Sequence, residues 1–266
     1  MSEGRPARSF RLDGRTAFVS GGAGHLGAAM VRALAAEGAH VIVNGRDAAR
    51  LDAFRAAMAA EGHDVSTACF DMMDFAASRA FFGGLARLDV LINNAVTVKP
   101  GKVESQTGED FDIAYRSTVT AAFEAMRAAE AALDAAVAAA GHASVVNIAT
   151  MYAHVSPDPR IYGEIGLNSP PAYGPAKAGL VQLTRHMAAH WGPKRIRVNS
   201  VSPGPFPNPS IAAAKPAFAA RLAEKTMLGR IGQPEEIAGA VVFLAGDNAS
   251  FVTGIDLGVD GGWRAW

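Results

Sequence analysis

The chain has 266 residues, half of them hydrophobic, and its 25 basic and 25 acidic residues cancel. This balance gives no electrostatic reason to expect nucleic acid or an anionic membrane as a partner, so we expect a small-molecule substrate. The single cysteine, Cys69, cannot form an internal disulfide, and residues 1–15 are polar and Arg-rich without an apolar stretch. Both features predict a cytoplasmic protein with no signal peptide or membrane anchor.

Short apolar runs alternate with longer runs of helical period along the whole chain. This alternation predicts an α/β fold, a Rossmann-type doubly wound parallel sheet of about seven strands with helices on both faces, in one domain over residues 1–266. We expect strands over residues 16–20, 40–44, 65–70, 90–93, 144–149, 196–201 and 255–259. We expect helices over residues 26–37, 48–60, 109–140 (one helix or two), 172–191 and 234–245.

A glycine-rich turn follows the first predicted strand and contains Gly21, Gly24 and Gly27. Glycines at this place let the backbone turn sharply and approach a pyrophosphate, which the next helix would hold at its amino terminus. A glycine-rich turn is weak evidence alone and could be merely structural. Its place between the first strand and helix of an alternating chain favours nucleotide binding.

Tyr173 and Lys177 lie four residues apart at the start of a predicted helix, and therefore on one face of it. An ammonium beside a phenol stabilises the phenolate, so this pair predicts a tyrosine with a lowered pKa that can exchange a proton. Taken alone, such a pair is also typical of a solvated helix surface.

Several separate motifs together resemble the short-chain dehydrogenase/reductase family, over residues 12–263. They are the glycine turn, Asn93-Asn94-Ala95, the segment from Tyr173 to Lys177, Pro203-Gly204, and a closing segment that includes Leu228-Gly229-Arg230 and Val259-Asp260-Gly261-Gly262. The resemblance implies an NAD(P)-dependent oxidoreductase that transfers a hydride between a nicotinamide cofactor and a secondary alcohol or ketone.

The resemblance also implies catalytic roles. Tyr173 would donate the proton to the carbonyl oxygen, Lys177 would lower the tyrosine pKa and bind the nicotinamide ribose, and Thr150 would orient the substrate oxygen. Thr118 occupies the place of an asparagine that supports the proton relay in the family. A hydroxyl group can hold a water molecule as an amide does, with a different reach, so the sequence leaves this relay open.

The cofactor specificity follows from the end of the second strand. Gly45 stands where NAD-preferring relatives carry aspartate, and Arg46 follows it, so NADP(H) is favoured over NAD(H). Alternatively, Arg46 only caps a surface turn beside Asp47, and Asp71 either binds the adenine amine, as in the family, or forms a turn. The other cofactor-binding positions implied by the resemblance are Gly21, Gly24, His25, Leu26, Gly27, Met72, Asn93, Ala95, Tyr173, Lys177, Pro203, Gly204, Phe206 and Asn208. His25 replaces a family glycine and would point away from the phosphates, near the ribose or toward solvent.

Twenty-two residues separate Thr150 from Tyr173, more than is usual for the family. Four of them, Asp158, Arg160, Tyr162 and Glu164, could reach over the nicotinamide and suit a hydroxylated or acidic small molecule such as a sugar, polyol or keto acid; a 3-oxoacyl compound is also open. Equally, this insert braces the surface or a subunit contact. Residues 206–225 resemble the mobile substrate lid of the family.

The chain ends in an aromatic tail, Trp263 to Trp266. We expect this tail to pack, and the resemblance implies a homotetramer or homodimer in which it lies at a subunit interface. No histidine pair has the further ligand that a metal site needs, so we expect no catalytic metal, although relatives sometimes hold a structural Mg²⁺ at the tail. A non-catalytic sensor or scaffold that binds the nicotinamide cofactor remains the alternative function.

Overall fold

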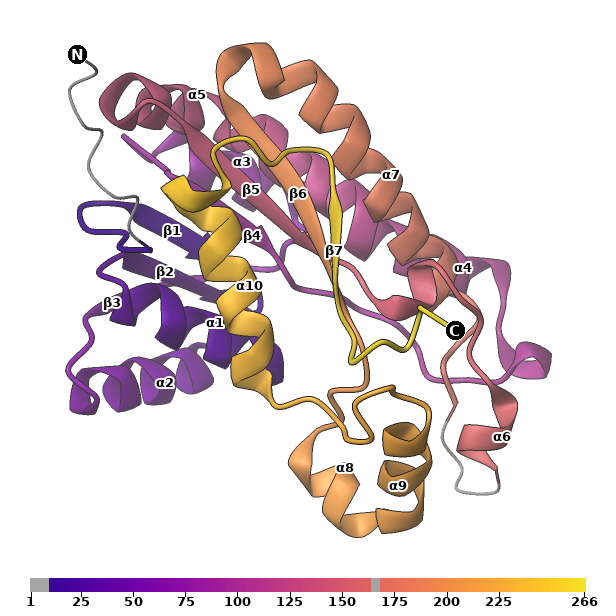
Figure 1. Cartoon of the computed structure of the whole chain (residues 1–266). Coiled ribbons are helices and arrows are strands. Elements are labelled where there is room, and N and C mark those ends of the chain that lie inside the picture. Colours follow the sequence, from indigo (N-terminus) through magenta and orange to yellow (C-terminus); the bar gives the residue numbers. More distant parts are fainter. Residues whose placement is uncertain (1–9, 164–167) are drawn as a thin grey trace, which may run out of the picture.

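Seven parallel strands form one sheet in the order β3-β2-β1-β4-β5-β6-β7, in a computed structural model that describes residues 10–163 and 168–266 (Figure 1). The sheet confirms the fold predicted from the alternating pattern. Its strands are β1 (Thr16–Val19), β2 (His40–Gly45), β3 (Val65–Cys69), β4 (Val90–Asn93), β5 (Ala143–Ile148), β6 (Ile196–Pro203) and β7 (Asp256–Val259).

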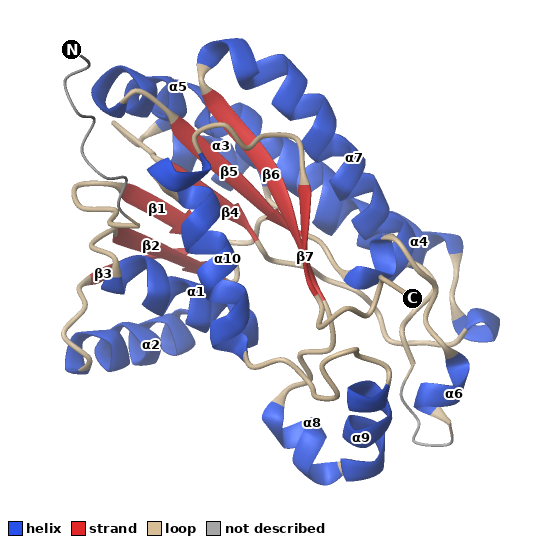
Figure 2. Ribbon diagram, in the orientation of Figure 1, coloured by secondary structure: helices blue, strands red, loops and turns tan. Residues whose placement is uncertain are grey.

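Helices cover both faces of the sheet (Figure 2). One face carries α1 (His25–Ala36), α2 (Ala48–Ala60) and α10 (Pro234–Ala245), and the other carries α3 (Phe75–Gly83), α4 (Gly108–Tyr115), α5 (Ala121–Ala140) and α7 (Tyr173–Trp191). Three further helices lie beyond the carboxyl ends of the strands: α6 (Pro159–Tyr162), α8 (Pro209–Ala214) and α9 (Pro216–Glu224). Among the described helices, none is long and apolar enough to cross a membrane.

The strands are apolar on both sides because each face of the sheet supports its own core. In β1, Phe18 packs with Phe82 of α3 on one face, while Val19 packs with Met30 of α1 and Ile237 of α10 on the other. All five side chains are buried. At roughly 1.5–3 kcal/mol for each large apolar side chain, this double burial holds the carboxyl ends of the strands in fixed positions.

The segment predicted as one or two helices over residues 109–140 contains a wider turn. Between α4 and α5 lies η2 (Arg116–Thr120), a π-helical turn. The Ser117 hydroxyl donates to the carbonyl oxygen of Thr97 at 2.8 Å and of Ala114 at 3.2 Å, so it competes with the helical pattern of backbone bonds. Such π turns are frequent at functional sites.

Helices α3, α8 and α9 are absent from the expectations drawn from the pattern. Asp74 begins α3 by accepting hydrogen bonds from the backbone N–H groups of Ala76 and Ala77. Pro209 and Pro216 occupy the first positions of α8 and α9, where the missing N–H of proline has no cost. The predicted lid is therefore a pair of short helices.

Strand β1 lies between β2 and β4, so the strand order reverses beside it. In an open parallel sheet, the crevice at such a reversal, outside the carboxyl ends of the strands, is where ligands bind. The glycine turn follows β1 directly. The topology thus places this turn at the expected ligand site.

Candidate active site

A cleft of about 550 Å³ opens at the carboxyl ends of the central strands. It brings together most of the residues singled out in the sequence, from the glycine turn at one end to the Tyr-Lys pair at the other. The predicted residues that line it are Gly21, Gly24, His25, Leu26, Gly27, Gly45, Arg46, Asp71, Met72, Ala95, Thr150, Tyr173, Lys177, Pro203, Gly204 and Phe206.

The glycine turn is held against the end of β4. Gly21 has a φ of +62°, which favours glycine, and the Asn94 side chain donates to the carbonyl oxygen of Ser20 at 2.8 Å. A Cβ atom at Gly27 would collide with the backbone of Gly21, so the turn needs glycine there too. Helix α1 has no acidic residue in its first turn. These features suit the negatively charged pyrophosphate of a dinucleotide.

His25 is the first residue of α1 and lines the cleft half-buried. Its Nε2 atom is buried and has no hydrogen-bond partner among the described residues. A buried polar atom without a partner costs free energy, and a cofactor in the cleft would supply a partner. Of the two positions expected for this side chain, the structure favours the one beside the cofactor over the one toward solvent.

Four charged side chains gather at the end of the cleft beyond β2. Arg46 lies 3.6 Å from the carboxylate of Asp71, and Arg50 donates to the carbonyl oxygen of Ala23 in the glycine turn at 2.8 Å. Asp47 caps α2 by accepting from the Arg50 backbone N–H at 3.0 Å. Arg46 therefore follows β2 beside Asp47 and has Asp71 as its ion-pair partner. Asp71 forms its own turn as well, because it accepts from the Met73 backbone N–H at 2.9 Å.

Tyr173, Lys177 and Thr150 meet at the opposite end of the cleft. Thr150 follows β5, and Tyr173 is the first residue of α7, so both stand at the carboxyl edge of the sheet. Lys177, one turn further, donates to the carbonyl oxygen of Ile148 and lies 5.9 Å from the centre of the Tyr173 ring. A phenol, an ammonium and a hydroxyl group thus lie together at this end of the cleft.

The pKa of Tyr173 departs from the expectation. Burial raises this pKa above its usual value, the hydrogen bond with Thr150 lowers it, and the charge of a Tyr162 phenolate would raise it further. The prediction that Lys177 lowers the pKa is wrong for this structure, because the ammonium is turned to the Ile148 carbonyl and burial outweighs the other effects.

Lys177 is only 2% exposed, although it carries an ionisable group. Burial disfavours its charged form and lowers the pKa to about 8. The Ile148 carbonyl is its hydrogen-bond acceptor. A lysine in this state is held rigidly in place and is partly neutral at mildly alkaline pH.

Thr118 and Asn93 lie behind Lys177 and do not line the cleft. Both line a small cavity of about 10 Å³ together with Lys177 and Ser20. The hydroxyl oxygen of Thr118 and Oδ1 of Asn93 are buried and have no partner among the described residues. The room is close to that of one water molecule, and ordered water is the usual partner of such groups. Asn93 therefore lies behind Lys177 and not at the surface of the cleft, where a contact with the cofactor was expected.

Asn208 also lies apart from the cleft. Its side chain caps α8 by accepting from the backbone N–H of Ser210 at 3.1 Å and from the Ser210 hydroxyl at 2.8 Å. The resemblance implied a contact with the cofactor phosphates, whereas here Asn208 is the cap of a short helix. The structure gives Asn208 a structural role.

Several residues line the cleft without having been predicted. The most informative is Arg50, which lies four residues after Arg46. This spacing was the signal in the sequence that could have indicated a second arginine at the same end of the cleft. The others were hidden by long-range packing: Ala23, Asn44, Asp47, Leu51, Phe70, Met73, Asn94, Val96, Thr97, Ser117, Ile148 and Ala149.

The insert between Thr150 and Tyr173 packs against the lid. Asp158 forms ion pairs with Arg160 at 2.7 Å and with Lys225, just after α9, at 3.1 Å. Ile161 is buried with Phe218 and Leu222 of α9. Asp158 therefore joins the insert to the lid, and neither Asp158 nor Arg160 lines the cleft; Glu164 lies outside the described residues.

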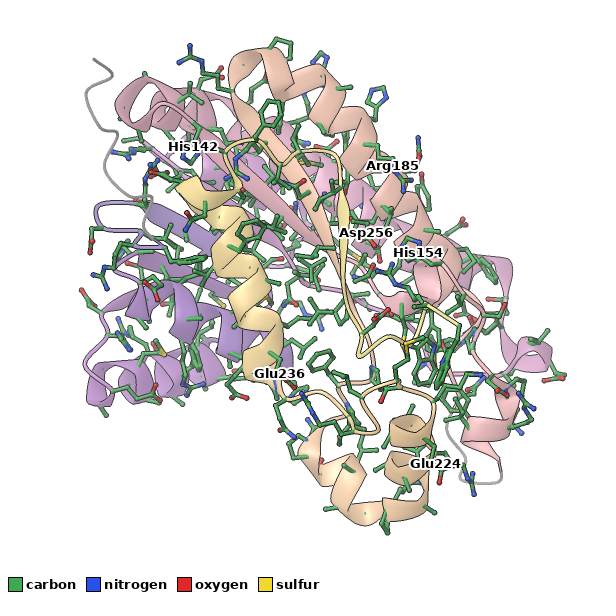
Figure 3. The ribbon with its side chains drawn as sticks, in the orientation of Figure 1. His142, His154, Arg185, Glu224, Glu236 and Asp256 are labelled. Carbon is green, nitrogen blue, oxygen red and sulfur yellow. The ribbon has the colours of Figure 1, made fainter. Side chains whose placement is uncertain are left out.

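The tail is fixed to the sheet by the same carboxylate that holds the segment after β5. Asp256 of β7 faces His154 at 2.8 Å and accepts from Arg264 of the tail at 2.8 Å (Figure 3). Trp263 is buried, and Trp266 donates from Nε1 to the carbonyl oxygen of Lys225 at 3.1 Å. The tail packs as expected.

Comparisons with known proteins agree with this geometry. The family model described as enoyl-(acyl carrier protein) reductase matches residues 21–264. Gluconate 5-dehydrogenase of Gluconobacter oxydans is 32% identical over 262 residues, which cover 95% of this chain and 96% of that protein. Galactitol 2-dehydrogenase (L-tagatose-forming) of Cereibacter sphaeroides is also 32% identical over 262 residues, covering 97% and 98% of the two chains.

Among solved structures, the RhlG/NADP active-site complex of Pseudomonas aeruginosa superposes with a TM-score of 0.87 at 29% identity, covering 97% of this chain and 99% of that one. The chain belongs to the short-chain dehydrogenase/reductase family. It is an oxidoreductase that uses a nicotinamide cofactor.

Proposed function

We propose that this protein is an NADP(H)-preferring oxidoreductase that interconverts a secondary alcohol and a ketone on a hydroxylated small molecule. The observation that carries the proposal is the meeting of Tyr173, Lys177 and Thr150 at one end of a cleft whose other end is a glycine turn at a helix amino terminus. Bound nicotinamide would supply or accept the hydride there.

The chain's own residues would manage the proton and the orientation of the substrate. Thr150 holds the reacting oxygen beside Tyr173, and the Tyr173 hydroxyl delivers its proton to that oxygen during reduction. Lys177, fixed by the Ile148 carbonyl, is placed to bind the nicotinamide ribose. Behind it, Thr118 and Asn93 would hold a water molecule that returns a proton to this site.

The preference for NADP(H) is supported by Arg46 and Arg50. Both line the end of the cleft beyond β2, and Gly45, the last residue of β2, has no side-chain carboxylate to bind the ribose hydroxyls. A 2′-phosphate would take the place of Asp71 as the partner of Arg46, with a second guanidinium from Arg50 beside it. The RhlG complex was solved with NADP, which agrees with this assignment.

The substrate class is supported by the names of two relatives, which act on gluconate and galactitol. Both compounds carry several hydroxyl groups. The polar residues that surround Tyr173 in this chain suit such a molecule better than a fatty chain.

We further propose that the protein is a cytoplasmic single domain that assembles into a homotetramer. Exposed aromatic side chains near the last strand and in the tail, Phe251 and Trp266, support a homo-oligomer. Size-exclusion chromatography with light scattering tests this assembly directly.

The function is tested by following NADPH and, separately, NADH consumption with keto-sugars, keto acids, simple ketones and β-ketoacyl thioesters. We expect turnover with NADPH and hydroxylated ketones. Tight NADPH binding without turnover of any substrate would replace this proposal by a cofactor-binding sensor or scaffold.

A further inference from the structure

Two phenol groups form a hydrogen-bonded pair beside the catalytic tyrosine. The hydroxyl oxygens of Tyr152 and Tyr162 lie 2.8 Å apart. Tyr152 belongs to η3 (Met151–Ala153), directly after Thr150, and Tyr162 ends α6 of the insert. The pair therefore joins the catalytic segment to the part of the chain that is longer than usual.

Packing places this pair close to the proton-transfer site. The backbone N–H of Tyr152 donates to the Thr150 hydroxyl oxygen at 3.4 Å, and a Cβ atom at Gly174 would lie 2.8 Å from the Tyr152 carbonyl oxygen. The backbone of η3 thus touches the first turn of α7, next to Tyr173. Tyr162 is close enough to Tyr173 for a charge on its phenol to raise the pKa of Tyr173.

The pair has hydrogen-bonding capacity to spare. Two phenol groups hold two protons, and the bond between their oxygen atoms uses one of them. Tyr162 also bonds with the Ser169 side chain, whose hydroxyl group can donate to it, so the second phenol proton remains available. Burial raises the pKa of both phenols above the usual value, so both remain neutral donors and acceptors. A neutral group that can both donate and accept is the complement of an alcohol.

The cations near the pair are already engaged. Arg160 and Lys225 both pair with Asp158, and Arg221 of α9 donates to the Ile161 carbonyl oxygen at 3.2 Å. A carboxylate-bearing substrate would have to break these contacts to find a positive partner. An uncharged polyol or ketose would bind to the neutral phenol pair without breaking any of these contacts, so the pair favours such a substrate.

From this arrangement, and resting on the proposed function, we infer that Tyr162 and Tyr152 form a substrate-binding pair that recognises a hydroxyl group next to the reacting carbon. The substrate class becomes a neutral polyhydroxylated ketone and its polyol. Tyr162 would make the contact, and Tyr152 would orient it. The insert thereby gives this chain a selectivity of its own.

The test compares 2-hydroxycyclohexanone with cyclohexanone, two ketones that differ by this one hydroxyl group, with NADPH as the reductant. The wild-type protein is expected to prefer 2-hydroxycyclohexanone. Tyr162→Phe keeps the ring against Phe218 and removes the hydroxyl group. Losing one hydrogen bond should lower kcat/KM about tenfold for 2-hydroxycyclohexanone and leave cyclohexanone nearly unchanged. Tyr115→Phe, an exposed tyrosine of α4, is the matched control.

The remaining outcomes separate this inference from the function on which it rests. Equal losses on both ketones would mean that Tyr162 only supports the packing, and would overturn the inference while the reductase assignment stands. A wild-type protein that reduces cyclohexanone as well as 2-hydroxycyclohexanone would do the same. Absence of turnover with every ketone despite NADPH binding would overturn both proposals. Tyr152→Phe should change the selectivity in the same direction by a smaller factor.

Discussion

Arg46 and Asp71 face each other across the mouth of the cleft with 3.6 Å between guanidinium and carboxylate. The arginine is 63% exposed, so this pair is weak in water and its partner is readily exchanged for a stronger one. A phosphate group is such a partner, because it can accept two parallel hydrogen bonds from a guanidinium. We therefore expect the cofactor specificity to depend on this pair.

We expect Arg46→Ala to raise the KM for NADPH and to leave the KM for NADH almost unchanged. A hydrogen bond to a charged group contributes about 1.5–3 kcal/mol, so the KM for NADPH should rise roughly 10- to 100-fold. Arg50→Ala should act in the same direction. Arg55→Ala serves as the control, since Arg55 is exposed on α2 and pairs with Asp52. An equal increase for both cofactors would contradict the assignment.

Tyr173→Phe should abolish turnover and retain cofactor binding. Removing the proton donor is expected to lower kcat by about 10²- to 10⁴-fold, because the ring still fills its place while the proton has no source. NADPH binding, measured by the change in nicotinamide fluorescence, should stay within a small factor of the wild-type value. A variant with full activity would exclude Tyr173 as the acid.

The buried Lys177 predicts an unusual dependence of stability on pH. Its pKa falls from 10.5 to about 8 in the folded protein. Between these two pH values only the unfolded chain keeps the proton, so the free energy of unfolding gains about 3 kcal/mol from this group as the pH rises. Lys177→Met should lose this rise and also lose activity. Urea unfolding of both proteins at pH 7.5 and 10 measures the difference; parallel changes would contradict the prediction.

Thr118→Val tests the small cavity behind Lys177. The substitution keeps the shape of the side chain and removes the hydroxyl group that lines the cavity. We expect kcat to fall about tenfold with the KM for NADPH unchanged, because the proton supply is impaired and the cleft is not. Thr118→Ser retains the hydroxyl group and should retain kcat. Equal activity in all three proteins would leave Thr118 without a part in the reaction.

Asp158→Asn should loosen the lid. Asp158 accepts from Arg160 and Lys225, and these bonds lower its pKa, so its stabilising effect is present above the pKa of the unfolded chain and is lost as the pH falls. In the variant the stabilising effect of this carboxylate is absent at every pH. Limited proteolysis of α9 at neutral and acidic pH checks both statements, and equal resistance of wild type and variant at pH 7 would refute them.

The sequence predicted those parts of the molecule that depend on local periodicity. Lys177 and Tyr173 share a face because they are one helical turn apart, and the sheet follows from the alternation of apolar runs. Periodicity does not encode local turns. The π turn that contains Thr118 and the short helix that Asn208 caps were therefore not foreseen. The pairing of Tyr152 with Tyr162 joins two segments through packing with α9, which no spacing rule contains.

The two lid helices differ in how they are anchored, and this difference bears on the order of events in a catalytic cycle. Helix α8 buries none of its residues, whereas α9 buries Phe218 and Leu222 against the insert. Release of α8 alone would break none of this buried packing, whereas release of α9 would also expose Ile161 of the insert. The two halves of the lid can therefore move in sequence, with α8 first, while α9 and the insert stay together as one unit.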